Sequence, residues 1–139
     1  ALLTTTALTG VSLATAAELP TGGSVVHGGV TVQTPAPNAM TIRQSTPTGI
    51  VNWQTFSVGQ GARVDITQPS ASSTLLNRVV GTAPSSIAGQ ITANGQVYLV
   101  NPNGLVITRS GVVKAGGGFV GSTLDISDDD FKNGRQNFR

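Results

Sequence analysis

The side chains that most often carry catalysis or bind metals are scarce in this chain. His27 is the only histidine and there is no cysteine, so neither a Ser-His-Asp triad nor a thiol or imidazole metal site is expected. Glu18 is the only glutamate and Asp65 stands alone, whereas a glycan-cleaving β-helix enzyme needs clustered carboxylates. Gly116-Gly117-Gly118 lacks the lysine and the serine or threonine that follow in a phosphate loop. We therefore expect no enzyme activity and no cofactor.

One acidic cluster could supply oxygen ligands to calcium: Asp125 and the run from Asp128 to Asp130. Lys132 and Arg135 follow closely, however, and the spacing lacks the glycine and the distal glutamate of an EF-hand loop. We expect a solvated turn at this cluster and no bound metal.

The most informative segment runs from Ala93 to Leu105 and places an apolar strand between two turn signals. The second signal, Asn101-Pro102-Asn103-Gly104, predicts a type I turn. In such a turn the Asn101 side chain accepts a hydrogen bond from the backbone two residues on, Pro102 presets φ, and glycine takes the fourth position. Turn chemistry explains all four residues. The alternative interpretation, that they also govern function, stays open at this point.

The whole chain has the composition of an all-β protein with many tight turns. Charged residues make up only 10% of the 139 residues, and no segment shows a convincing 3.6-residue period. The net charge of +2 is not gathered on one face, so nucleic acid is not an expected partner. After Gly104 the predicted strands are only three or four residues long. Such strands are stable when the chain coils and equivalent strands stack, which predicts a parallel β-helix, with a β-sandwich as the alternative.

The first residues differ from the rest. Residues 1–16 carry no charge, and Ala14-Thr15-Ala16 has the small-x-small pattern read by signal peptidase. We interpret this stretch as the remnant of a secretory signal peptide, which implies passage through the Sec machinery. An apolar N-terminal strand is the alternative.

Several blocks resemble one known family. Ile50 to Gly59, with Asn52, Trp53 and Phe56, resembles the NW-x-x-F-x-[IV]-G block of the two-partner secretion domain, also called the filamentous haemagglutinin N-terminal or haemagglutination activity domain. Four further blocks follow in family order and extend the resemblance over roughly residues 19–138: Gln68-Pro69 together with Leu76 to Gly81, which includes Asn77; Pro84 to Gly89; Ala93 to Leu105; and Phe119 to Ile126 with Phe131 and Gly134.

This resemblance implies a fold, a function and partners. The expected fold is a right-handed parallel β-helix with an N-terminal cap. The expected function is that of a secretion-targeting module of a large adhesin- or haemagglutinin-like exoprotein, recognised in the periplasm by the POTRA domains of an outer-membrane β-barrel transporter. The expected location is outside a Gram-negative cell, where the rest of the exoprotein could contact a host cell surface. A β-helical adhesin segment that binds host glycan or protein directly is the alternative.

The resemblance also suggests roles for individual residues. It marks Asn101, Pro102, Asn103 and Gly104 as a secretion motif. We expect Trp53 and Phe56 to fill the core or its cap, and Asn52 and Asn77 to be inward or turn asparagines.

The chain departs from the family at two points. Gln68-Pro69-Ser70-Ala71 stands where some members carry Asn-Pro-Asn-Leu, so the role of that motif is not carried over. We also expect residues 17–139 to be the N-terminal part of a domain that is incomplete at its C-terminus.

Overall fold

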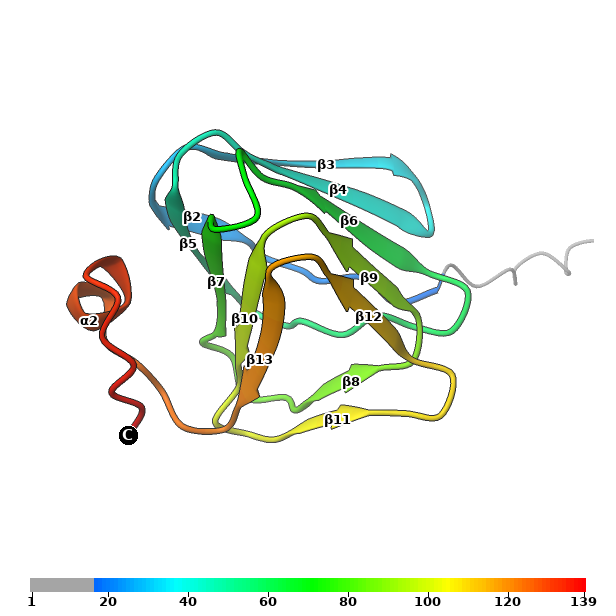
Figure 1. The fold of residues 1–139 in the computed structure, drawn as a ribbon. Helices are drawn as coiled ribbons and strands as arrows, with labels where there is room; N and C mark the ends of the chain where they lie inside the picture. Colours follow the sequence, from blue (N-terminus) through cyan, green and yellow to red (C-terminus); the bar gives the residue numbers. More distant parts are fainter. Residues whose placement is uncertain (1–16) are drawn as a thin grey trace, which may run out of the picture.

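A computed structural model describes residues 17–139, so the predicted signal-peptide remnant, residues 1–16, lies outside the described residues. The described chain winds into a β-solenoid of about four turns (Figure 1). Its only described helix is too short and too polar to cross a membrane. The elements are β2 (Ser24–His27), β3 (Val30–Ala36), β4 (Ala39–Gln44), β5 (Thr48–Trp53), β6 (Arg63–Thr67), β7 (Thr74–Val79), β8 (Ser85–Ile87), β9 (Gln90–Ala93), β10 (Gln96–Val100), β11 (Leu105–Ile107), β12 (Val112–Ala115), β13 (Gly118–Ser122) and α2 (Asp128–Lys132).

Strands pair with their equivalents one coil away, not with their neighbours in sequence. The first sheet has the order β13-β10-β7-β5-β2, the second has the order β12-β9-β6-β4-β3, and the narrow third sheet pairs β11 with β8. In the first sheet Leu76 lies in parallel register with Ile50 on one side and Tyr98 on the other. The prediction of a parallel β-helix is therefore confirmed, and the β-sandwich alternative is wrong.

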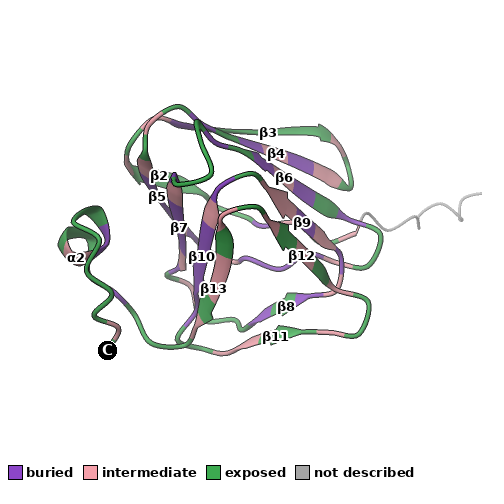
Figure 2. Cartoon of the chain, in the orientation of Figure 1, coloured by how far each residue is buried: buried purple, intermediate pink, exposed green. Residues whose placement is uncertain are grey.

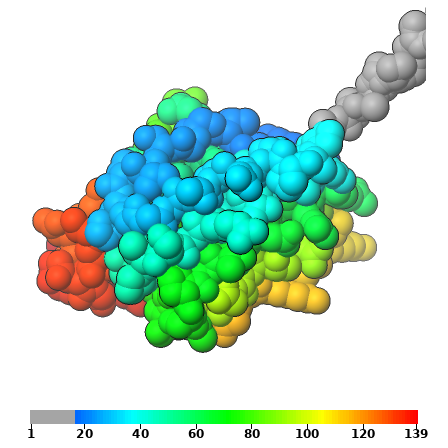
Figure 3. Space-filling view, turned by 90° about the horizontal axis from the view of Figure 1, so that it is seen from above, coloured from blue at the N-terminus to red at the C-terminus, as the bar shows by residue number. Residues whose placement is uncertain are grey.

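The first coil is capped by strands that run the opposite way. β2 pairs antiparallel with β5, and β3 pairs antiparallel with β4. Seen from above, these N-terminal strands, coloured blue to cyan, spread over one face of the molecule (Figure 3). The capped β-helix expected for the family is thus what the chain forms.

The core fills the inside of the coils. Because side chains alternate across each strand, one set faces the solenoid axis and stacks from coil to coil. Trp53 and Phe56 are both buried there, and their rings meet edge to face with centroids 5.5 Å apart. Buried residues, drawn purple, recur along β4, β6, β7 and β10, whereas β3 is almost entirely exposed (Figure 2). The largest fully buried side chains are Trp53, Phe56, Ile42, Ile50, Leu75, Leu76, Ile87, Ile91, Leu99, Val51, Val58 and Val64.

A second apolar layer lies outside the first sheet. Residues 125–139, which we call the strap, pack Ile126, Phe131 and Phe138 against this outer face. The strap contains α2, whose N-cap is Ser127: its side chain accepts a hydrogen bond from the Asp130 N–H. The aspartates are largely exposed, as expected for a solvated segment, but they do not form a simple turn. Asp128 to Asp130 begin a capped helix, and Asp125 and Asp128 pair with the distant Arg78.

Candidate functional site

The turn predicted from Asn101 to Gly104 joins β10 to β11 at a corner of the solenoid. The Gly104 N–H donates to the Asn101 backbone oxygen at 3.1 Å and closes the turn. The Asn103 N–H donates to Asn101 Oδ1 at 2.9 Å, which is the side-chain bond that the sequence predicts. Gly104 has φ +125°, a conformation that favours glycine.

The same turn is fastened to the preceding coil. Asn101 is fully buried, and its Nδ2 donates to the Ala83 oxygen at 3.0 Å and to Ser85 Oγ at 2.9 Å. Asn103 Nδ2 donates to the Gly81 oxygen at 2.8 Å. The two asparagine side chains therefore bind one corner of the solenoid to the corner below it.

This corner continues through the neighbouring coils. The Asn101 N–H donates to the Ser122 oxygen at 2.9 Å, on the following coil. On the other side, the Gly81 backbone lies so close to the Gln54 oxygen that a Cβ at this position would clash with it. The turn thus belongs to a continuous column of closely packed corners.

Asn77 lies in the core and not in a turn. Its side chain is inaccessible to solvent, between Val51 and Leu99 in the parallel register, and its Oδ1 accepts a hydrogen bond from Trp53 Nε1 at 3.0 Å. Its Nδ2 donates to the Tyr98 oxygen at 3.3 Å. An inward asparagine was one of the two placements expected for this residue.

Asn52 differs from that expectation. It lies within β5 on the outer face, one residue from the inward Trp53, and its Oδ1 accepts a hydrogen bond from Arg78 Nη1 at 3.1 Å. The placement expected from the sequence, inward or in a turn, is wrong because strand alternation puts the residue before an inward tryptophan on the opposite face.

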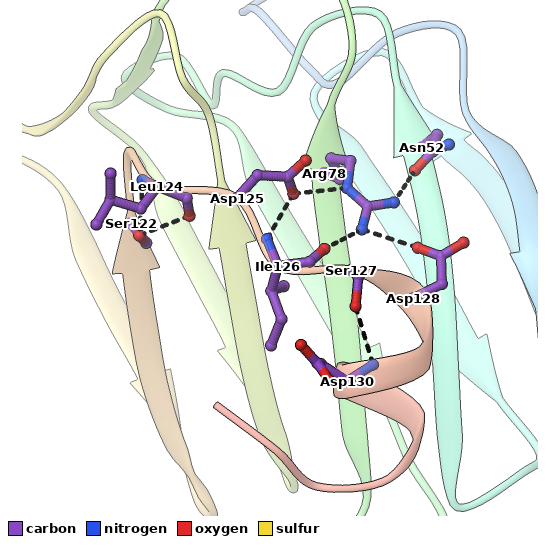
Figure 4. Close-up of polar contacts among 9 residues, drawn as sticks. All are labelled: Asn52, Arg78, Ser122, Leu124, Asp125, Ile126, Ser127, Asp128 and Asp130. Atoms are coloured by element: carbon purple, nitrogen blue, oxygen red, sulfur yellow. Dashed lines mark hydrogen bonds and ion pairs between the residues drawn. The ribbon is translucent and has the colours of Figure 1, made fainter. Parts of the chain in front are cut away.

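Arg78 organises a polar cluster on that outer face (Figure 4). Its Nε donates to Asp125 Oδ1 at 2.9 Å, and its Nη2 lies 2.8 Å from Asp128 Oδ1 and donates to the Ile126 oxygen at 2.6 Å. Burial alone would lower the pKa of Arg78, but the hydrogen bonds and charges of the two aspartates outweigh it and raise the pKa above its ordinary value. Sequence reasoning missed this cluster, because the partners lie far apart in the chain.

A second polar group missed by sequence reasoning lies at the corner before the first sheet. Gln68 Nε2 donates to Gln44 Oε1 at 3.2 Å and to the Gln96 oxygen at 3.0 Å, while its Oε1 accepts from the Gly95 N–H at 2.8 Å. This glutamine stands at the start of the segment where some family members have Asn-Pro-Asn-Leu. Here it links three successive coils.

The polar side chains at these corners form hydrogen bonds within the protein and stabilise the fold. Among residues 17–139, no buried side-chain nitrogen or oxygen lacks a hydrogen-bond partner. Within the same range no three histidine, aspartate or glutamate side chains are grouped so that they could hold a metal ion. The Asn101 amide is fully engaged in hydrogen bonds within the protein, so this side chain holds coils together in the folded state.

Comparison with known proteins defines the class. The family model described as TPS secretion domain matches residues 15–138, and the chain belongs to this family. The HMW1 secretion domain from Haemophilus influenzae, a crystal structure, superposes with a TM-score of 0.76 at 38% identity and covers 82% of this chain and 30% of its own. TPS domains belong to exoproteins of the two-partner secretion pathway, which implies an outer-membrane transporter as partner and a secreted or cell-surface location in Gram-negative bacteria. The family is one of secretion domains and not of enzymes.

Two curated relatives are much longer than this chain. A heme/hemopexin-binding protein of Haemophilus influenzae strain Rd is 45% identical over 125 residues, which are 90% of this chain and 14% of that protein. A second heme/hemopexin-binding protein of Haemophilus influenzae is 34% identical over 125 residues, or 13% of its length. The similarity therefore concerns a small part of each of these proteins.

Proposed function

We propose that this domain is the secretion-targeting module of a large exoprotein and that POTRA domains of its outer-membrane transporter recognise the chain before it folds. The proposal rests on the burial of the Asn101 side chain in the folded domain. Its side chain is fully buried and is hydrogen-bonded to Ala83, Ser85 and Asn103. The folded domain buries Asn101, whereas an unfolded chain exposes its polar groups and its β-prone segments to strand addition by a partner.

In this proposal the Asn101 to Gly104 turn acts through folding. Once the chain reaches the cell surface, the turn fastens its own coil to the coil before it, and the following coil then stacks on it in parallel register. Replacing the turn asparagines slows this step without removing the segments that the transporter binds. Secretion then falls because the exported chain fails to fold and slides back or is degraded.

A secretion assay tests the proposal. The domain would be expressed behind an intact signal peptide, in its exoprotein context, with and without the cognate transporter. Folded protein in the medium only with the transporter supports the targeting function. Equal release in both strains would contradict it and would favour the alternative of a β-helical segment that adheres directly to host glycan or protein, which binding of the purified domain to cells then measures.

The names of the curated relatives suggest an activity for the whole exoprotein. We propose that this exoprotein also binds heme or hemopexin, and that residues outside this domain do so. His27, the only histidine, bonds through Nε2 to Thr48 Oγ1 at 2.9 Å, and the only methionine, Met40, is buried. The domain alone should therefore not shift the heme Soret absorbance, while the full exoprotein should bind heme or hemopexin. A Soret shift with the isolated domain would contradict this assignment.

A further inference from the structure

The strap is closed on itself. The Asp125 N–H donates to the Arg139 oxygen at 3.0 Å, and the Arg139 N–H donates back to the Asp125 oxygen at 2.7 Å. Ile126 and Phe138 form an antiparallel bridge beside this pair. The two ends of the segment therefore hold each other, and the strap keeps a shape of its own instead of continuing the coil.

The apolar contacts of the strap are separate from the solenoid core. Phe131 meets the Tyr98 ring edge to face at 5.1 Å, and Phe138 stacks on the same ring at 6.4 Å. Together with Ile126 they cover a strip formed by Ile50, Leu76 and Tyr98. This strip lies on the outer face of the first sheet, while Trp53 and the main core lie on its inner face. The sheet thus separates two apolar layers.

Arg78 ties the strap to the solenoid. Three of its bonds go to strap residues, namely Asp125, Ile126 and Asp128, and a fourth goes to Asn52 on the neighbouring strand. The guanidinium is nearly buried, with 12% of the side chain exposed. Such a group is costly to leave unpaired, so it holds its partners firmly when the strap is closed.

From this arrangement we propose that the strap is a lid that opens as one unit, with Arg78 as its latch, and uncovers the strip of Ile50, Leu76 and Tyr98 while the coils stay folded. The coils keep their own ladder hydrogen bonds and their own core when the lid is open, because neither involves the strap. Segments attached by few buried contacts open locally well before the whole domain unfolds. In this proposal Arg78 acts by holding the strap in position against the outer face of the sheet.

The order of these residues along the chain predicts when the lid closes during folding. Arg78 lies in β7, while its acidic partners come after β13. The latch therefore closes only when β13 has stacked on β10 and brought Asp125 over the outer face. Until then Ile50, Leu76 and Tyr98 are exposed on the outer face, and closure of the strap buries them.

Two natural probes distinguish lid opening from unfolding. Trp53, the only tryptophan, reports the inner core, and Tyr98, the only tyrosine, reports the strip under the strap. Hydrogen exchange read by mass spectrometry on the folded 139-residue chain adds the strap amides of Phe131, Arg135 and Arg139, each of which bonds within the strap. We expect these amides to exchange faster than the ladder amides of β7 and β10.

The variant Arg78→Leu tests the latch. We expect strap exchange and binding of a hydrophobic dye to rise roughly 10- to 100-fold, since hydrogen bonds to a charged group are lost, with Trp53 fluorescence and β7 exchange unchanged. Arg63→Leu is the matched control, because Arg63 pairs with Asp65 on an exposed surface away from the strap. It should leave strap exchange at its original rate.

A second variant keeps the test decisive if Arg78→Leu does not fold. Asp125→Asn combined with Asp128→Asn weakens the latch from the strap side and leaves β7 intact. Faster strap exchange with an unchanged coil supports the lid. Strap amides that exchange no faster than the coil in the unmodified chain, or variants that accelerate strap and coil equally, would overturn the proposal and make the strap an inseparable part of the fold.

Discussion

Trp53 Nε1 donates a hydrogen bond to Asn77 Oδ1 at 3.0 Å inside the solenoid, from one coil to the next. Both side chains are shielded from solvent, and the Asn77 amide also reaches the Tyr98 oxygen. Asn77 thus supplies the hydrogen-bond acceptor for the Trp53 indole N–H in an otherwise apolar layer. A buried donor of this kind is stable only while its acceptor is present.

Asn77→Ala should lower the free energy of unfolding by about 2–4 kcal/mol, because it leaves the Trp53 N–H unpaired and opens a cavity. Denaturant unfolding followed by Trp53 fluorescence measures the change. Asn52→Ala is the comparison, since it removes one partly buried bond to the Arg78 guanidinium on the outer face, opens no core cavity, and should cost about 1.5 kcal/mol. An equal decrease in the free energy of unfolding for the two variants would show that the buried Trp53–Asn77 bond stabilises the domain no more than the outer bond does.

Asn101→Asp should destabilise the domain by about 2–3 kcal/mol and reduce secretion. The carboxylate can still accept from the Asn103 N–H, but it cannot donate to Ala83 and Ser85, and its charge is buried. Asn103→Asp, at an exposed position, should cost less. Thermal unfolding and the amount of folded protein in the medium are the two measurements, and a harmless Asn101→Asp would show that the corner tolerates an acceptor alone.

Gly81→Ala should be more harmful than Gly104→Ala, although only Gly104 has a positive φ. A methyl group at Gly81 meets the Gln54 backbone oxygen of the coil below, which forces the coils apart and should cost about 3 kcal/mol. At Gly104 there is space, with Pro84 Cβ 3.5 Å away, so only the backbone conformation is strained, at about 1–2 kcal/mol. Melting temperatures of the two variants rank them, and the reverse order would mean that coil spacing adapts easily.

Acid should loosen the strap. The hydrogen bond from Arg135, helped by Asn137 and Ser127, lowers the pKa of Asp130 below its ordinary value of 3.8. A carboxylate with a lowered pKa in the folded state contributes stability above the unfolded pKa and loses it as the pH falls through the folded pKa. Strap exchange should therefore increase below about pH 4, near the ordinary aspartate pKa. Asp130→Asn should remove this part of the pH dependence, and an NMR titration of Asp130 that gives an ordinary pKa would contradict the prediction.

Local chemistry made some features predictable. The Asn101 to Gly104 turn follows from residue preferences at four adjacent positions, and its side-chain bond to the Asn103 N–H forms as expected. Short strands separated by glycine-rich turns indicated coiling, because such strands are too short to be stable in isolated hairpins. The family blocks then placed the chain within a capped β-helix.

Long-range partners could not be predicted in this way. Asp125 and Asp128 look like solvated acidic residues in sequence, yet they pair with Arg78, which precedes them by more than one coil. The same holds for Gln68, whose partners Gln44 and Gln96 lie on the coils before and after it. Which residues meet across coils depends on the number of residues in each turn, and the spacing of apolar residues alone does not determine that number.

Because β2 and β3 run antiparallel to the strands they pair with, the two ends of the solenoid differ, and these two strands cap one of the ends. Beyond β5 and β4 the neighbouring strands run in the opposite direction, so a parallel strand finds no template on that side. On the other side β12 and β13 run parallel to β9 and β10, on which they stack. New coils can therefore stack in parallel only at the β12–β13 end of the folded domain.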